Sequence, residues 1–158
     1  MTPGRFCLIA AVALAAPLAA AAAPPAMNAG AWLRSTTFEL NGSAAKFPLL
    51  SKGLGIPMKS TVCISAEVAR RGPLAIVLAG DEQDCHLASA AISNGDFTAK
   101  RTCPADKGGE DVFDMSARFT PDSIKMTSAI HSAHGGQATA HSELRRVGPC
   151  RADTPPPG

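Results

Sequence analysis

The sequence predicts a mainly β domain, in which an antiparallel meander forms a curled sheet or a small partial barrel, with one short helix and two disulfides. Three observations support this prediction. Short alternating segments are separated by turn signals, of which Asn94-Gly95 is the strongest. No helix-period segment is long enough to cover a whole sheet, so we expect the sheet to curl on itself. Four cysteines remain once an N-terminal leader is set aside, and an even number is typical of disulfides in small exported proteins.

The N-terminus has the pattern of a secretory signal peptide. Arg5 supplies a positive charge, and the following residues to Ala23 are almost wholly apolar. The run Ala20-Ala21-Ala22 fits a small-residue cleavage signal, so we predict a signal peptide over residues 1–22, with a retained anchor as the alternative. The protein is then periplasmic or extracellular, and no transmembrane span is expected after leader cleavage.

The remaining chain suits one exported domain over residues 23–150. Residues 151–158 include three consecutive prolines and no apolar pattern, which predicts a disordered tail. Only one of the 15 Lys and Arg residues lies in the leader, so 14 basic residues face 13 acidic ones in the mature part. This near-neutral balance argues against a nucleic-acid partner.

The first strand is predicted at Ala31 to Leu40. Its aromatic residues Trp32 and Phe38 share one parity, and the run ends at the turn signal Asn41-Gly42. Residues 43–57 contain two prolines and two glycines, so we expect a loop with at most one short edge strand.

A strand and a helical turn are predicted next. Lys59 to Ile64 forms a short strand, and Ser65 to Arg70 resembles one helical turn that Ser65 caps and that ends near Gly72-Pro73. The apolar run Leu74 to Ala79 is only six residues long, so its periodicity fits helix and strand equally well.

The segments on either side of Asn94-Gly95 predict a β-hairpin. A two-residue turn would place Cys103 opposite His86, whereas a three-residue loop over 93–95 would place Cys103 opposite Cys85. That pair would fall on a non-hydrogen-bonded site, where Cα atoms approach to about 4.5 Å, a distance that a disulfide accepts. Of the three connectivities, we therefore predict Cys85–Cys103, which leaves Cys63–Cys150 by exclusion.

The C-terminal third predicts three more strands. Val112 to Thr120 alternates, Thr120-Pro121-Asp122-Ser123 is a turn, and the partner strand contains Ile124, Met126 and Ile130. Gly135-Gly136 then reverses the chain, and Gln137 to Val147 returns toward Cys150. The large apolar residues of the hairpin and these strands share an inward parity, and they are Phe97, Phe113, Met115, Phe119, Met126 and Ile130. We expect them to form a solid core, with a ligand cavity as the alternative.

Several motifs together resemble a known family. They are Gly30-Ala31-Trp32 after the leader, Cys63-Ile64-Ser65-Ala66-Glu67, the cysteine hairpin with Asn94-Gly95, and the closing Arg145-Arg146-Val147-Gly148-Pro149-Cys150. These residues resemble the bacterial secreted family catalogued as domain of unknown function 3617, over about residues 28 to 150. The usual Pro-Gly-Leu-Trp start is replaced here by Asn28-Ala29-Gly30-Ala31-Trp32. The resemblance implies a bacterial envelope protein with paired cysteines and implies no activity.

The C-terminal histidines are the only candidate metal ligands. If Gly135-Gly136 forms the turn, His131 lies almost opposite His141, with Glu143 nearby, and two histidines there could clamp zinc or copper. Such a site would have only two good ligands. A polar outer face is therefore the preferred interpretation, and no cofactor is expected.

Other charged residues predict solvated surface. Asp81, Glu82 and Asp84 lack the spacing of a calcium loop. The basic pairs Lys100-Arg101 and Arg145-Arg146 fall on strands, where alternation splits each pair between the two faces.

No catalytic motif is present, so no catalytic residue is assigned. The prediction is a non-enzymatic exported β domain that binds a small apolar ligand inside the curled sheet, or another envelope component. The alternatives are a metal-dependent enzyme or metal-binding protein that uses the C-terminal histidines, and an inhibitor or assembly factor that acts through a sheet edge.

Overall fold

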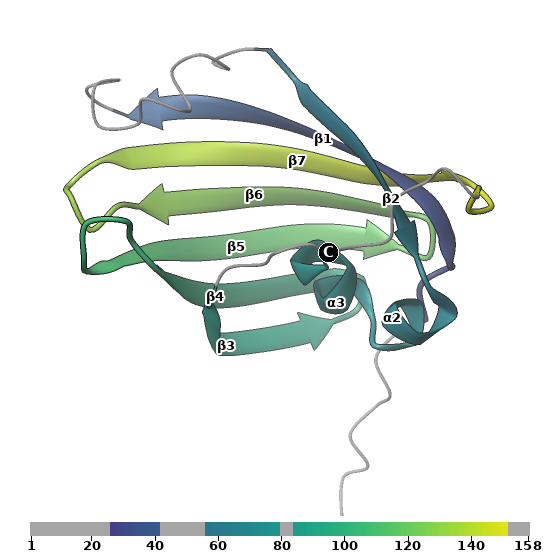
Figure 1. Cartoon of the computed structure of the whole chain (residues 1–158). Coiled ribbons are helices and arrows are strands. Elements are labelled where there is room, and N and C mark those ends of the chain that lie inside the picture. Colours follow the sequence, from purple (N-terminus) through teal and green to yellow (C-terminus); the bar gives the residue numbers. More distant parts are fainter. Residues whose placement is uncertain (1–25, 42–55, 80–83, 152–158) are drawn as a thin grey trace, which may run out of the picture.

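The computed structural model describes residues 26–41, 56–79 and 84–151. They form seven strands and two short helices, which Figure 1 labels. The strands are β1 (Gly30–Asn41), β2 (Met58–Ile64), β3 (His86–Ser93), β4 (Asp96–Pro104), β5 (Glu110–Thr120), β6 (Ser123–His131) and β7 (Gln137–Gly148), and the helices are α2 (Ala66–Arg70) and α3 (Pro73–Leu78). The predicted leader, most of the loop over 43–57 and nearly all of the predicted tail lie outside these ranges.

All seven strands belong to one antiparallel sheet in the order β2-β1-β7-β6-β5-β4-β3. Strands β3 to β7 form the predicted meander, and β1 pairs with β7, so the first strand lies beside the last. The sheet curls but does not close, because β2 and β3 remain its two edges (Figure 1). The predicted fold class is confirmed. A functional role for either edge stays a prediction.

Strands β4 to β7 each bury one face, as their alternation predicts, whereas all eight residues of edge strand β3 are exposed. In β7, buried residues at 138, 140, 142 and 144 alternate with exposed or half-buried neighbours. All six predicted interior residues lie on the concave face, four of them buried, while Phe113 and Met126 are half-buried. The period of two residues therefore identified the buried face of strands β4 to β7.

The predicted helical turn is α2. Ser65 is its N-cap, and the Ser65 hydroxyl accepts a hydrogen bond of 3.2 Å from the backbone N–H of Val68. The ambiguous apolar run is a second helix, α3, so the prediction of one helix was one too few. Pro73 in the first turn favours a helix start, and Gly72 adopts a positive φ of 94° immediately before it.

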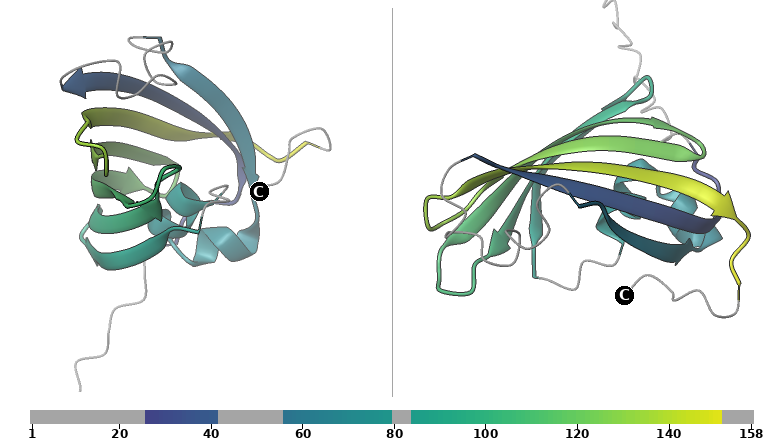
Figure 2. Two further views of the ribbon diagram at one scale, coloured as in Figure 1. Left: turned by 60° about the vertical axis from the view of Figure 1, so that its left-hand side comes forward. Right: turned by 90° about the horizontal axis from the view of Figure 1, so that it is seen from above.

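Both helices lie on the concave side of the sheet, near the end where β2 finishes (Figures 1 and 2). There they complete the main hydrophobic core, which draws on both helices and on six of the strands. Its largest fully buried side chains are Trp32, Ile64, Ile76, Phe97, Ile124 and Leu144.

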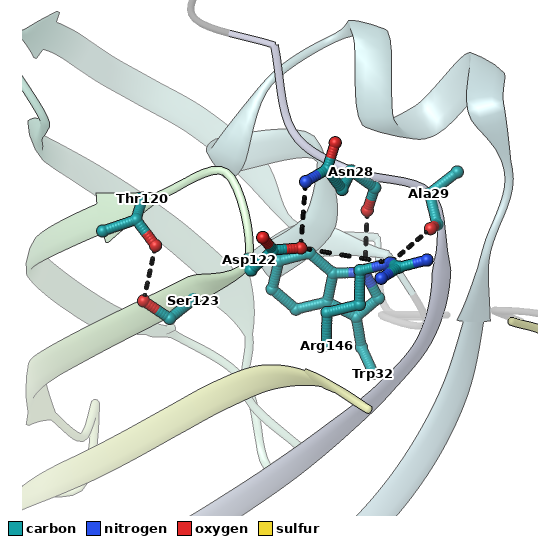
Figure 3. Close-up of polar contacts among 7 residues, drawn as sticks. All are labelled: Asn28, Ala29, Trp32, Thr120, Asp122, Ser123 and Arg146. Atoms are coloured by element: carbon teal, nitrogen blue, oxygen red, sulfur yellow. Dashed lines mark hydrogen bonds and ion pairs between the residues drawn. The ribbon is translucent and has the colours of Figure 1, made fainter. Parts of the chain in front are cut away.

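A polar network closes this end of the sheet (Figure 3). The Trp32 side chain is 0% exposed, and its indole N–H donates to the backbone oxygen of Asn28 at 3.0 Å. The Asn28 side chain donates in turn to Asp122 Oδ1 at 2.9 Å, in the turn between β5 and β6. The segment before β1 is thereby tied across the sheet, and the buried indole N–H is satisfied.

Arg146 of β7 completes the network. Its Nε donates to the backbone oxygen of Ala29 at 2.7 Å and lies 4.0 Å from Asp122 Oδ1. Gly30 allows this close approach, since it has a φ of +139° and an added Cβ would collide with the Gly148 carbonyl oxygen. This explains why the first residue of β1, two positions before Trp32, is a glycine.

The β3–β4 hairpin corrects one step of the sequence argument. Its turn has two residues, since Ser93 pairs with Asp96 and both Asn94 and Gly95 adopt positive φ, at 44° and 87°. The predicted three-residue loop was wrong, because positive φ at both positions gives the primed turn that matches strand twist. A register shift between Leu87 and Ser89 then brings Cys85 and Cys103 together, as the predicted three-residue loop would have done.

The structure has two disulfides, and they join the predicted pairs. Cys85 and Cys103 have a Cα–Cα distance of 4.1 Å, and Cys63 and Cys150 have one of 5.5 Å. The first bond closes a single hairpin. The second links edge strand β2 to the segment after β7, at a sequence separation of 87.

We expect the two disulfides to differ in their contribution to stability. In the chain-entropy treatment, the Cys63–Cys150 loop corresponds to about 4–5 kcal/mol and the Cys85–Cys103 loop to about 3 kcal/mol. The Cys63→Ala/Cys150→Ala variant should therefore lose more unfolding free energy than Cys85→Ala/Cys103→Ala. Urea unfolding under matched conditions measures both values, and the reverse order would contradict the expectation.

Candidate functional site

The concave face of the sheet carries a cavity of about 410 Å³. It lies between the main core and a second, smaller apolar cluster built on Ile130, Ala138 and Ala140, with Phe38, Leu40 and Phe113 packed against it. Side chains from both clusters line the cavity. The interior is therefore packed near the helices and hollow beside them, so the expectation of a solid core holds for only part of the sheet.

Four neighbouring strands supply most of the wall, and each does so through alternate residues. They are Arg34, Thr36 and Phe38 of β1, Ala140, Ser142 and Leu144 of β7, Met126, Ser128 and Ile130 of β6, and Phe113 and Met115 of β5. Alternation places all of these side chains on the concave face. The same pattern that builds the core thus also builds the cavity.

Helix α3 forms part of the wall through Val77 and Leu78. The Arg34 guanidinium donates to the backbone oxygen of Val77 at 3.0 Å. This carbonyl belongs to the last turn of the helix, where carbonyl groups have no partner within the helix and favour a nearby cation. Arg34 therefore attaches the C-terminal end of α3 to β1.

Polar side chains interrupt the apolar wall at two places. Thr36 and Ser142 share a hydrogen bond of 2.9 Å between their hydroxyl groups. Ser128 is only 5% exposed and also lines the cavity.

One basic side chain of the wall lies on an aromatic ring. The Arg101 guanidinium carbon is 4.9 Å from the centroid of the Phe113 ring. Both residues are half-buried and line the cavity. Such cation–π contact fixes the plane of the guanidinium group.

The candidate metal ligands do not come together. His131 pairs with Gln137, and His141 pairs with Thr127, so the two histidines lie four residues apart along the ladder, or about 13 Å. The expected near-opposition was wrong because the loop spans residues 132–136, closed by a bond from Ser132 N to the Gly136 oxygen, rather than being centred on Gly135-Gly136. Glu143 pairs with Lys125, still farther from His131.

Each of these histidines instead has a separate acidic neighbour on the convex face. His131 Nε2 lies 3.9 Å from Asp114, and His141 Nε2 lies 3.8 Å from Glu39. Across the part of the chain that the structure describes, no group of three or more His, Cys, Asp or Glu side chains could hold a metal ion. The metal-site hypothesis therefore has no support in the geometry.

Sequence reasoning missed the basic residues of the cavity. One signal was available, because Arg34 shares the parity of Trp32 and Phe38, and a charge on a buried face is unusual. Alternation along β4 also predicts that Arg101 and Lys100 lie on opposite faces. The structure agrees, since Lys100 lies 3.6 Å from Asp114, whereas Arg101 lines the cavity.

The fold and the cavity define a small disulfide-linked β domain with a half-open, partly hollow sheet. Residues 27–150 match the family described as "Protein of unknown function (DUF3617)", which covers more than half of the chain. The chain belongs to this family, as its motifs suggested. No curated protein and no solved structure matches it. Within the described ranges, no helix is both long enough and apolar enough to cross a membrane.

Substitutions of two inward-facing alanines should distinguish hollow from packed regions. Ala140→Leu adds carbon atoms toward the cavity, so we expect it to leave the free energy of unfolding unchanged or raise it by about 1 kcal/mol. Ala117→Leu adds the same atoms within the main core and should cost about 1–3 kcal/mol. Urea unfolding compares the two variants, and equal destabilisation would indicate that the region beside Ala140 is packed.

Proposed function

We propose that this protein is a non-enzymatic binding protein of the bacterial envelope, and that its concave cavity holds a small apolar ligand. The observation that carries the proposal is the cavity between the two apolar clusters. Its volume of about 410 Å³ falls in the range of small-molecule sites. Its wall is mostly aliphatic and aromatic, with a few hydroxyl and basic groups, which is the usual composition of such sites.

The position of the cavity also supports binding. The two helices contribute only 11 residues, and they pack at one end of the concave face. Apolar residues such as Phe113 and Met126 are left half-buried on that face. A bound ligand would remove this surface from water, at about 25 cal/mol for each Å² of apolar area buried.

Export is the second part of the proposal. Disulfides persist in oxidising compartments, and two of them join all four cysteines of the predicted mature chain. The apolar N-terminal segment with its small-residue cleavage signal would direct the chain to the secretion machinery as a signal peptide.

Mass spectrometry of the exported protein tests the leader. We expect the mature chain to begin at Ala23, after cleavage between Ala22 and Ala23. Thiol alkylation without reductant should modify none of the four remaining cysteines. An intact N-terminus, or four alkylated thiols, would contradict the proposal of an exported, oxidised domain.

A neutral fluorescent probe tests the cavity. N-phenyl-1-naphthylamine gains fluorescence in apolar surroundings, and we expect it to bind the purified protein at a ratio of about one to one. Ala140→Leu should weaken binding at least several-fold, because the added side chain occupies part of the cavity.

Ala129→Leu is the matched control, since Ala129 lies on β6 beside Ser128 and has the opposite, outward parity. It should bind the probe as the wild type does. Absence of saturable binding by the wild type, or equal loss in both variants, would rule out the concave cavity as the site.

A further inference from the structure

We propose that two copies of this protein associate through edge strand β3, so that their sheets join into one continuous antiparallel sheet across a two-fold axis. This surface lies outside the proposed ligand site, since among the described residues none of β3 lines the cavity. The exposure of β3 and the register in which it can pair with itself carry the proposal.

Strand β3 is covered on neither face and along only one edge. All eight of its residues are exposed, although Phe97 and Ala99 of the neighbouring strand β4 are buried. Among the described strands, β4 alone pairs with β3, which forms the lower edge of the sheet in Figure 1. An open edge presents backbone N–H and C=O groups that form a template for another strand.

The sequence of β3 lacks the residues that usually prevent a sheet edge from pairing. The strand reads HLASAAIS and contains no lysine, arginine, aspartate, glutamate or proline. The other edge strand, β2, carries Lys59, and a disulfide from its Cys63 ties it to Cys150. Charged residues, above all lysine, are a common protection of natural edges. Of the two edges, β3 is therefore the one suited to pairing with another chain.

The hairpin turn determines which backbone groups of β3 point to the open edge. In a two-residue turn the flanking residues, here Ser93 and Asp96, form a hydrogen-bonded pair. Hydrogen-bonded and non-hydrogen-bonded pairs alternate along an antiparallel ladder. Ile92 and Ala90 therefore direct their N–H and C=O groups away from β4, toward the open edge.

These backbone groups match a second copy of the same strand. The register shift between Leu87 and Ser89 leaves residues 89–93 as the regular part of β3, with Ala91 at its centre. If Ala91 lies opposite the second copy's Ala91, then Ala90 of each copy lies opposite Ile92 of the other. Each of these two pairs can exchange two backbone hydrogen bonds. One patch thus serves both copies, as a two-fold interface requires.

The side chains agree with the same register. Ile92 is 37% exposed and lies on the concave face, because it pairs with the buried Phe97. A two-fold axis perpendicular to the sheet keeps the concave faces on one side, so the two Ile92 side chains become diagonal neighbours and cover each other. On the convex face, Ser89 of each copy lies opposite Ser93 of the other, where their hydroxyl groups can share a hydrogen bond. A second copy is therefore the partner that this edge fits.

Sedimentation equilibrium of the oxidised protein over a series of concentrations tests the association. We expect a reversible dimer with a Kd of about 10–100 μM, because an interface of one strand from each copy is small. Ala91→Lys should weaken the dimer about fivefold or more, since it places like charges directly opposite each other at the axis. Ala91 is exposed, so the folded monomer can accommodate the lysine.

Thr61→Lys is the matched control. Thr61 is an exposed residue of the other edge strand, β2, so this variant gains the same charge on the edge that the proposal leaves unpaired. It should dimerise as the wild type does.

Cysteine cross-linking tests the register. Ala91→Cys should form a disulfide between copies under mild oxidation, because Ala91 and its counterpart form a non-hydrogen-bonded pair, in which Cα atoms approach to about 4.5 Å. Ser89→Cys is the matched control on the same strand, since the two copies of residue 89 would lie four residues apart along the ladder, or about 13 Å. It should not cross-link.

Several outcomes would overturn the inference. A wild type that stays monomeric up to about 1 mM would leave the β3 edge to a strand of another protein and rule out a second copy as its partner. Unchanged dimerisation of Ala91→Lys, or loss of the dimer in Thr61→Lys alone, would place any interface elsewhere. Equal cross-linking of Ser89→Cys and Ala91→Cys would contradict the register. The cysteine variants keep the test valid even if Ala91→Lys does not fold.

Discussion

The structure depends on one constraint, which is that the two helices of the described residues are too short to cover the concave face of a broad, curved sheet. Strands β4 to β7 bury alternate side chains on that face, whereas the described helices are one or two turns long. Where α2 and α3 pack, Trp32, Ile64 and Ile76 become fully buried and a core forms. Beside them, apolar side chains from β1, β5, β6 and β7 surround a cavity whose wall α3 completes through Val77 and Leu78. Core and cavity are thus two results of the same alternating pattern, and the length of the helices decides which one occurs.

The parts of the fold that depend on local pattern could be predicted from the sequence. Alternation identified the inward face of strands β4 to β7, and Ser65 identified the start of α2, because both signals act over a few residues. The Cys85–Cys103 pair was also predicted, although the alignment arises from a bulge near Ala88 and not from a longer turn. A one-residue irregularity leaves no clear mark in a sequence, so its position could not be predicted.

The candidate site was much less predictable. The face of β1 that Arg34 occupies follows from its parity. The cavity beside Arg34, however, depends on where α3 packs. The apolar run Leu74 to Ala79 could not be assigned to a helix from its sequence, so the position of α3 could not be predicted. The proposed histidine pair failed for a related reason. The position of His141 across from Thr127 is set by a five-residue loop, and a small error in the assumed turn moves a side chain by several positions along the ladder.

The pairing of β1 with β7 has a consequence for how the chain can fold. Gly30 and Gly148 come to lie side by side although they stand near opposite ends of the described chain. During synthesis from the N-terminus, β1 emerges first and can pair with β2, but its other neighbour, β7, becomes available only when almost the whole polypeptide has been made. The β3–β4 hairpin, by contrast, needs only its own residues, and its cysteines can meet early. Contacts that are distant in sequence form slowly, since loop closure must precede them. Folding is therefore expected to begin at the β3–β4 hairpin and to finish with the pairing of β1 and β7. A chain truncated before β7 would leave one edge of β1 unpaired and able to pair with another chain.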